Sequence, residues 1–189
     1  MSVPEIRTER LWLRGWKEQD LDPFAQMSAD AEVMRHFPAT LSRAESAAMI
    51  GRIGAHFDHH GFGMWAVEVV ETGAFIGFVG LGVPRFEARF TPCVEIGWRL
   101  SRASWGHGYA TEGARAALHR GFTAHGLEEI LAFTVPANGR SRAVMERLGM
   151  RHFPEEDFDH PLLPEGHPIR RHVLYRIRRG EVLTPPSGG

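Results

Sequence analysis

The spacing of apolar residues predicts strands and helices that follow one another along most of the chain. Alternating apolar residues and short apolar runs indicate strands, whereas apolar residues three and four apart indicate helices. We expect strands over about residues 10–16, 64–70, 74–83, 93–100, 130–135, 150–153 and 172–178. We expect helices over about residues 22–27, 42–60, 108–125 and 138–148. This order predicts a mixed α/β sheet with helices on its faces.

Several helix ends carry recognisable signals. Ser42 and Glu45 form a capping box, which predicts the start of the second helix. Asp22 before Pro23 resembles an N-cap followed by proline at the first helical position. Asn138 is a candidate N-cap for the last helix, and Gly149 suits the position just after its end.

Composition narrows the class of protein. The chain has 189 residues, of which 43% are hydrophobic, so we expect one domain over residues 1–183 and a flexible tail over 184–189. The only cysteine, Cys93, excludes a disulfide framework and a zinc site with several cysteine ligands. Because no apolar run approaches the ~20 residues of a membrane span and no signal peptide is evident, we expect a cytoplasmic protein without metal or membrane.

Charge is nearly balanced overall but uneven along the chain. The net charge is -1, which argues against general binding to nucleic acid. Residues 91–189 nevertheless carry 13 basic and 11 acidic side chains, and all basic residues except Lys17 are arginine. The arginine content is explained either by codon usage or by binding of a polyanion in the second half.

The segment over residues 93–111 carries the candidate chemistry. Val94, Ile96, Trp98 and Leu100 fall on one face of the expected strand, which we assign to the core. The opposite face carries Cys93, Glu95, Gly97 and Arg99, an unusual set for a central strand. This face is either part of a functional cleft or simply half-solvated.

A glycine-rich turn, Trp105-Gly106-His107-Gly108, joins that strand to the next helix. Backbone N–H groups and the positive end of the helix dipole make such a turn suitable for an anion. The Walker A loop and the dinucleotide-binding fingerprint are both excluded, because no lysine follows the turn and position 111 is Thr. The turn therefore predicts a phosphate or pyrophosphate site of another kind.

Several ordered motifs together resemble the GNAT N-acetyltransferase superfamily, and the RimJ/RimL branch of ribosomal-protein N-terminal acetyltransferases in particular. The resemblance runs from about Arg7 to Arg178. The motifs that carry it are Thr8-Glu9-Arg10-Leu11-x-Leu13-Arg14, Glu95-Ile96-Gly97-Trp98, Trp105-Gly106-His107-Gly108-Tyr109-Ala110-Thr111-Glu112 and Asn138-x-x-Ser141-x-x-Val144-x-x-Arg147-Leu148-Gly149-Met150.

The resemblance implies a central, mostly antiparallel twisted sheet in which two splayed parallel strands, 93–100 and 130–135, bind acetyl-CoA. It also implies direct attack by an amine in a ternary complex, and it leaves a homodimer open. The residues that it assigns to the cosubstrate are Trp98, Arg99, Leu100 and Asn138 on the pantetheine arm, and the backbone of Gly106, His107, Gly108, Tyr109, Ala110 and Thr111 on the pyrophosphate.

Two residues are candidates for proton transfer. Glu95 projects from the cleft face and is the candidate general base, directly or through water; the alternative is an ion pair with Arg99. Ser141 is the candidate donor to the leaving thiol; the alternative is a role in capping the helix that follows Asn138. Cys93 is not expected to be a nucleophile, because direct attack needs no acyl-enzyme.

The remaining histidines and aromatic residues have two interpretations each. His56, His59 and His60 form either a solvated helix end, which we favour, or a metal-binding face. The other residues border the acceptor pocket or pack within the protein: His160, His167, His172, Trp65, Phe86 and Phe90.

The expected function is acetyl transfer to a protein N-terminus or to a small-molecule amine. The alternatives are a non-catalytic CoA-binding sensor or interaction module on the same fold, and an unrelated phosphate-ligand binder. An intact set of Glu95, Asn138 and Ser141 favours the enzyme.

Overall fold

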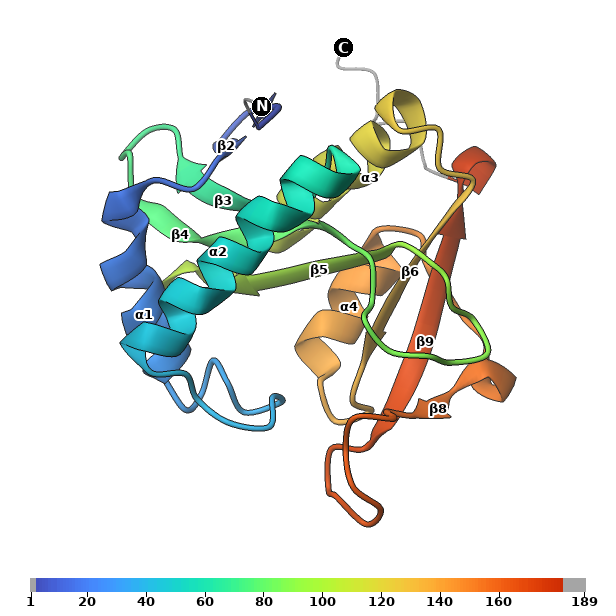
Figure 1. Ribbon diagram of the computed structural model, residues 1–189. Helices are drawn as coiled ribbons and strands as arrows, with labels where there is room; N and C mark the ends of the chain where they lie inside the picture. Colours follow the sequence, from blue (N-terminus) through green and yellow to red (C-terminus); the bar gives the residue numbers. More distant parts are fainter. Residues whose placement is uncertain (1–2, 182–189) are drawn as a thin grey trace.

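The computed structural model describes residues 3–181, which fold around a single twisted sheet (Figure 1). Its strands are β1 (Ile6–Arg7), β2 (Leu11–Arg14), β3 (Met64–Val69), β4 (Phe75–Gly82), β5 (Glu95–Leu100), β6 (Glu129–Thr134), β7 (Arg151–His152), β8 (Phe158–Asp159) and β9 (Arg171–Arg178). Its α-helices are α1 (Leu21–Ala29), α2 (Arg43–His60), α3 (Tyr109–Ala124) and α4 (Gly139–Arg147). The expected tail over 184–189 and the domain limit at 183 lie outside the described residues.

The sheet follows the order β1-β2-β3-β4-β5-β6-β9-β7, and β8 pairs with β9. Every pairing among the described strands is antiparallel except that of β5 with β6. This confirms the expected mixed sheet with one parallel pair. The short strands β1 and β8 were not predicted, because two-residue strands leave no periodic pattern.

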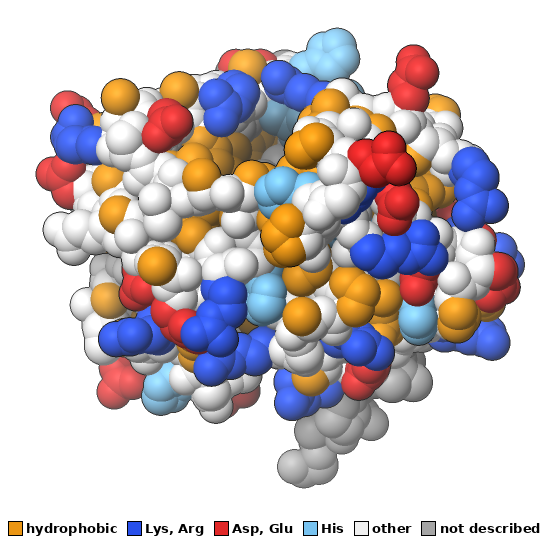
Figure 2. All heavy atoms as spheres, turned by 90° about the horizontal axis from the view of Figure 1, so that it is seen from below, with side chains coloured by type: hydrophobic (Ala, Val, Ile, Leu, Met, Phe, Trp, Pro, Cys, Tyr) orange, Lys and Arg blue, Asp and Glu red, His pale blue; other side chains and the backbone are white. Residues whose placement is uncertain are grey.

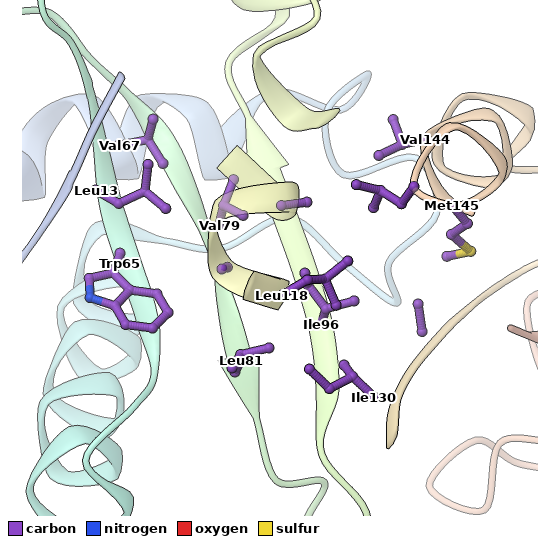
Figure 3. Packing of buried hydrophobic residues seen from close by; sticks show 14 of the residues in the cluster. Leu13, Trp65, Val67, Val79, Leu81, Ile96, Leu118, Ile130, Val144 and Met145 are labelled. Carbon is purple, nitrogen blue, oxygen red and sulfur yellow. The ribbon is translucent and has the colours of Figure 1, made fainter. Parts of the chain in front are cut away.

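Helices cover both faces of the sheet. Val79, Leu81 and Ile96 pack against α3 through Leu118, and these side chains meet in the centre of Figure 3. On the opposite face Phe78 packs with Phe24 of α1 and with neighbouring residues of α2. In Figure 1, α1 and α2 accordingly lie on one side of β4 and α3 on the other. The alternation of β5 is thereby confirmed, since Ile96 and Leu100 are buried on the α3 side.

The cap predictions were confirmed except at the first helix. Ser42 and Glu45 form the capping box of α2, and the Asn138 side chain accepts a hydrogen bond from the backbone of Ser141 at the start of α4. The prediction that Asp22 is the N-cap of α1 was wrong, because α1 begins at Leu21, two residues before Pro23. The residue at the N-cap position is Asp20, whose side chain makes no capping hydrogen bond. No helix of the described residues is long and apolar enough to cross a membrane.

Asp20 belongs to a buried ion-pair network around Arg14. The Arg14 guanidinium donates to both carboxylate oxygens of Asp20, at 2.7 and 2.8 Å, and to Glu68 at 2.8 Å. The side chains of Arg14 and Asp20 are only 2% and 1% exposed. Because buried charges are costly unless paired, this network fixes β2 against β3 and against the start of α1.

We expect Arg14→Met to lower the free energy of unfolding by about 3–5 kcal/mol, because the buried carboxylate of Asp20 and the partly buried carboxylate of Glu68 lose their partner. The control is Arg43→Met, whose ion pair with Asp22 is exposed and whose loss costs about 0–1 kcal/mol. Urea denaturation at pH 7 measures both values. Equal losses in the two variants would contradict this account of Arg14.

Candidate active site

The divergence of β5 and β6 opens the main cleft of the protein. The two strands share one residue pair, Glu95 with Leu131, beside a hydrogen bond from Leu131 N to Val94 O at 2.9 Å. Beyond that pair they separate, as Figure 1 shows. The resulting cleft has a volume of about 1900 Å³. It is large enough for an extended ligand that replaces the missing strand neighbour.

Two loops flank the cleft, one around residues 32–38 and the other around 160–169. Seen from below, this face is hollowed, with hydrophobic side chains inside and Lys or Arg and His side chains at the rim (Figure 2). The charged residues that line the cleft are six arginines and four glutamates: Arg10, Arg35, Arg99, Arg115, Arg140, Arg147, Glu9, Glu32, Glu95 and Glu112. The cleft therefore has an excess of positive charge although the chain does not.

The glycine turn lines the cleft at its end near the start of α3. Gly106 and Gly108 have φ angles of +81° and +79°, a conformation that side-chain-bearing residues rarely adopt. Gly108 is the N-cap of α3, so the first backbone N–H groups of that helix point toward this end. Trp105 ties the turn to β5, because its indole N–H donates to Leu100 O at 2.9 Å. The arrangement suits a phosphate group.

The first turn of α3 is held by Thr8 and Arg10, which lie 104 and 102 positions before Glu112 in the sequence. Glu112 accepts hydrogen bonds from Thr8 Oγ1 at 2.6 Å and from Arg10 Nε at 2.7 Å. Arg10 also donates to the carbonyl oxygen of His107, at 3.0 Å. Burial raises the pKa of Glu112, but the hydrogen bonds from Thr8 and Arg10 outweigh this effect and lower it overall. The sequence analysis gave these residues no role in the turn.

Glu95 lies on the cleft face of β5. No hydrogen bond or ion pair to its carboxylate is found among residues 3–181, and burial raises its pKa to about 7. At neutral pH a substantial fraction of the carboxylate is deprotonated and still basic enough to accept a proton from an ammonium group. Glu95 thus has the position and the basicity expected of a general base.

Arg99 projects from the same face of β5 and also lines the cleft. Its side chain is not paired with Glu95, so the ion pair considered as an alternative does not form. Instead, the guanidinium carbon lies 4.3 Å from the ring centroid of Phe37. Two charged groups of opposite sign therefore occupy one strand face without neutralising each other.

Asn138 and Ser141 lie at the start of α4, on the β6 side of the cleft. Asn138 Oδ1 accepts from the Ser141 backbone at 3.2 Å, and Asn138 Nδ2 donates to Thr134 Oγ1 at 3.0 Å. The second Nδ2 hydrogen remains available to a ligand. Ser141 takes part in the helix cap only through its backbone N–H. The Ser141 hydroxyl has no hydrogen bond within the described residues, so the hydroxyl is free to contact a ligand.

Cys93 does not lie on the strand face where the sequence analysis placed it. β5 begins only at Glu95, and Cys93 packs with Leu131 and Phe158 and is not itself among the residues that line the cleft. Burial, followed by the nearby carboxylates of Glu95 and Glu129, raises the pKa of its thiol to about 11. At neutral pH this thiol is protonated and a poor nucleophile.

None of the aromatic candidates Trp65, Phe86 and Phe90 lines the cleft. Trp65 is fully buried and donates to Pro4 O, so it belongs to the core. Phe86 and Phe90 pack with Cys93 and Phe158 rather than at the cleft. The buried Tyr175 donates to Glu146 and accepts from Arg142, away from the cleft lining.

Two of the three late histidines border the cleft. His160 and His172 line it, with ring centroids 5.1 Å apart, whereas His167 does not. His56 and His60 pack together near Phe62 at the end of α2 instead, with their ring centroids 4.3 Å apart.

Comparison with known proteins adds an independent line of argument. The sequence model of the Acetyltransferase (GNAT) domain matches residues 10–151. The FsC-acetyl coenzyme A-N(2)-transacetylase of Aspergillus fumigatus is 39% identical over 131 residues, which are 65% of this chain and 53% of that protein. The crystal structure of an acetyltransferase from Agrobacterium tumefaciens matches with a TM-score of 0.75 and 27% identity, covering 94% of this chain and 96% of the other.

A further solved structure has the same fold with a bound CoA derivative. RimJ of Mycobacterium smegmatis in complex with CoA-disulfide matches with a TM-score of 0.73 and 23% identity, covering 90% of this chain and 83% of that protein. At this identity the match supports the fold alone.

The elevated thiol pKa of Cys93 predicts low reactivity. We expect iodoacetamide to alkylate the native protein at pH 8 at least about tenfold more slowly than free cysteine, because little thiolate is present. Mass spectrometry of timed samples measures the rate, and the same protein in denaturant is the control. Native alkylation as fast as in the denatured chain would contradict the assigned environment.

Proposed function

The chain belongs to the acetyltransferase (GNAT) family, whose members transfer acetyl from acetyl-CoA, and from this premise we propose that it acetylates a primary amine by direct attack in a ternary complex. The family makes the protein an N-acetyltransferase. The observation that carries the proposal is the cleft itself, with a glycine turn at the start of α3 and an unpaired, partly protonated carboxylate on β5.

The residues present fit acetyl-CoA. The backbone N–H groups from Gly106 to Thr111 would hold the pyrophosphate, supported by the dipole of α3. The backbone of Trp98, Arg99 and Leu100 would pair with the pantetheine arm at the β5 edge that β6 leaves open. Asn138 would donate its remaining Nδ2 hydrogen to the same arm, and Arg115 and Arg147 line the cleft where further phosphate charge needs balance.

Glu95 would accept a proton from the acceptor ammonium, directly or through one water. The neutral amine then attacks the thioester carbonyl, forming the C–N bond as the C–S bond breaks. Ser141 would donate a hydrogen bond or proton to the departing sulfur, because its hydroxyl has no other partner within the described residues. An ammonium acceptor gives up two protons: Glu95 would take the first and later release it to solvent, and the second would leave the nitrogen as the amide forms and pass, with Ser141 as relay or hydrogen-bond donor, to the departing sulfur. The products are then the amide, the CoA thiol and one released proton.

The acceptor amine belongs to the same proposal. A relative whose name describes N(2)-transacetylation supports a nitrogen acceptor. The RimJ/RimL branch is supported by Trp105 and by the Thr8–Arg14 segment, and it would make a protein N-terminus the acceptor. A homodimer is a further part of this proposal that rests on the resemblance alone, and a cytoplasmic location is a further part that rests on features of the amino-acid sequence.

Glu95→Gln is expected to lower kcat by about 10²–10⁴-fold, because general-base catalysis is lost. In the wild-type enzyme kcat should rise with pH up to the Glu95 pKa of about 7, because only the deprotonated carboxylate accepts a proton. The variant should lose this inflection while its affinity for acetyl-CoA stays within twofold. Thiol release measured at saturating acetyl-CoA gives the profile, with Glu71→Gln on the exposed β3–β4 turn as the control.

An unchanged pH profile in Glu95→Gln would remove Glu95 from the mechanism. No thiol release with any primary amine, despite normal CoA binding, would favour the non-catalytic sensor instead.

Gly108→Val is expected to weaken CoA binding by about 10- to 100-fold. A β-branched residue is strained at φ +79°, and its side chain would occupy space beside the phosphate. Isothermal calorimetry with CoA measures the loss. Gly73→Val is the matched control, because Gly73 has φ +67° in the hairpin turn between β3 and β4, away from the cleft. Wild-type affinity in Gly108→Val would refute the pyrophosphate site.

A further inference from the structure

The protein contains two deeply buried arginines, and only one of them is paired. Arg14 is bound by Asp20 and Glu68. Arg99 is 8% exposed, and its Nε and Nη1 atoms are buried without a hydrogen-bond partner in the part of the chain that the structure describes. Because unpaired buried donors are costly, a guanidinium left in this state next to a cleft indicates a missing anion.

The contacts that Arg99 does make cannot satisfy its donors. Phe37 and Phe78 lie 4.3 and 5.3 Å from the guanidinium carbon, measured to their ring centroids. Such stacking occupies the flat faces of the guanidinium and leaves the N–H groups at its edge free. Stacking also holds the group in one orientation, which favours a planar, two-oxygen partner.

No carboxylate of the neighbouring loop is free to serve Arg99. Glu32 is the acidic residue of the loop that carries Phe37, and it is paired with Arg35 and with Arg140, the latter at 3.7 Å. The other charged or titratable groups of this loop that line the cleft are Arg35 and His36, which do not offer an anion. Burial, the only cause found, lowers the pKa of Arg99 to about 10, so the group stays charged at neutral pH.

Along β5, a cross-strand pair of glycines separates the position of Arg99 from that of Glu95. Phe78 lies opposite Arg99, Gly80 opposite Gly97, and Gly82 opposite Glu95. The middle pair has no side chains, and the backbone of Gly63 and the side chain of Met64 pack closely against it. Four residues of strand place the two charged positions about 13 Å apart at their Cα atoms, a span that the two long side chains shorten.

We propose that Arg99 binds an anionic group of the acceptor, a carboxylate or a phosphonate-like group, so that the substrate carries its amine and an anion in one molecule. This inference rests on the proposed function, because Glu95 marks where the amine reacts. The amine would lie near Glu95, and the anion would meet the guanidinium of Arg99 where it faces the cleft.

Arg99 is separated from the phosphate-binding end of the cleft. Its side chain lies on the face of β5 that packs with α1 and Phe37, whereas the glycine turn begins α3 on the other side of the sheet. The side chain of Arg99 should therefore act on the acceptor and leave affinity for CoA unchanged, while its backbone keeps the role proposed for the pantetheine arm.

The experiment compares acceptors in matched pairs that differ only in the anion. Glycine, γ-aminobutyrate and glycylglycine are each tested against the corresponding carboxamide, and aminoethylphosphonate tests the alternative anion. We measure kcat/KM for wild type, Arg99→Gln and Arg99→Lys, together with CoA affinity and thermal unfolding. Arg52→Gln, an exposed substitution on α2 outside the cleft, is the control.

We expect the wild-type enzyme to prefer at least one carboxylate or phosphonate over its neutral counterpart by about 10- to 100-fold. Arg99→Gln should abolish this preference through the acceptor KM without changing CoA affinity by more than twofold, and Arg99→Lys should restore part of it. The arm that shows the preference identifies the anion.

Equal kcat/KM for both members of every pair in wild type, or an undiminished preference in Arg99→Gln, would overturn the inference while leaving acetyl transfer intact. If no amine is acetylated, the proposed function fails, and the anion site is then judged by calorimetry of the same carboxylates with the CoA-bound protein. Binding that is lost in Arg99→Gln would support the site, and the absence of binding in wild type would refute it. If Arg99→Gln does not fold, the wild-type preference and Arg99→Lys still decide.

Discussion

The end of strand pairing after Glu95 is the constraint on which the rest of the site depends. β5 keeps its full antiparallel partner, β4, yet β6 leaves it after one residue pair. Backbone groups along the open edge then need another partner, because buried N–H and C=O groups are rarely left unpaired. The two faces of β5 therefore differ. Ile96 and Leu100 are buried in the core on one face, and Glu95 and Arg99 line the cleft on the other.

The cleft has two different proposed anion-binding features, the backbone at the start of α3 and the side chain of Arg99. At the proposed pyrophosphate site, at the start of α3, backbone geometry would let a chain of net charge -1 bind a strongly anionic cosubstrate. At the proposed acceptor site, one desolvated side chain, Arg99, would interact with an anion more strongly than it does in water. Four arginines of the second half, Arg99, Arg115, Arg140 and Arg147, line the cleft, which is where the polyanion interpretation would place them.

Local signals explain what the sequence could predict. The capping residues Ser42 and Asn138 act on neighbours three positions away, and the alternation of β5 is a property of one strand. Contacts between distant segments left no such signal. Arg10 contacts Glu112 across 102 positions in the sequence. The N-cap of α1 is Asp20, whose side chain pairs with Arg14, whereas the local sequence favours Asp22 before Pro23 as the cap. The lack of a partner for Arg99 could not be predicted from the sequence either. The strand pattern places Glu95 and Arg99 on the same face of β5, but it does not show that the two side chains form no ion pair.

The anchoring of Glu112 by Thr8 and Arg10 has a practical consequence for protein engineering. The residues that would cradle the pyrophosphate are far from the N-terminus in sequence, yet their support comes from the β1–β2 turn. A shortened or crowded N-terminal segment would therefore loosen the cosubstrate site while leaving every residue of the cradle in place. A purification tag or fusion partner joined ahead of Thr8 needs a spacer that preserves this turn, and an inactive fusion says nothing about the chemistry until that spacer has been varied.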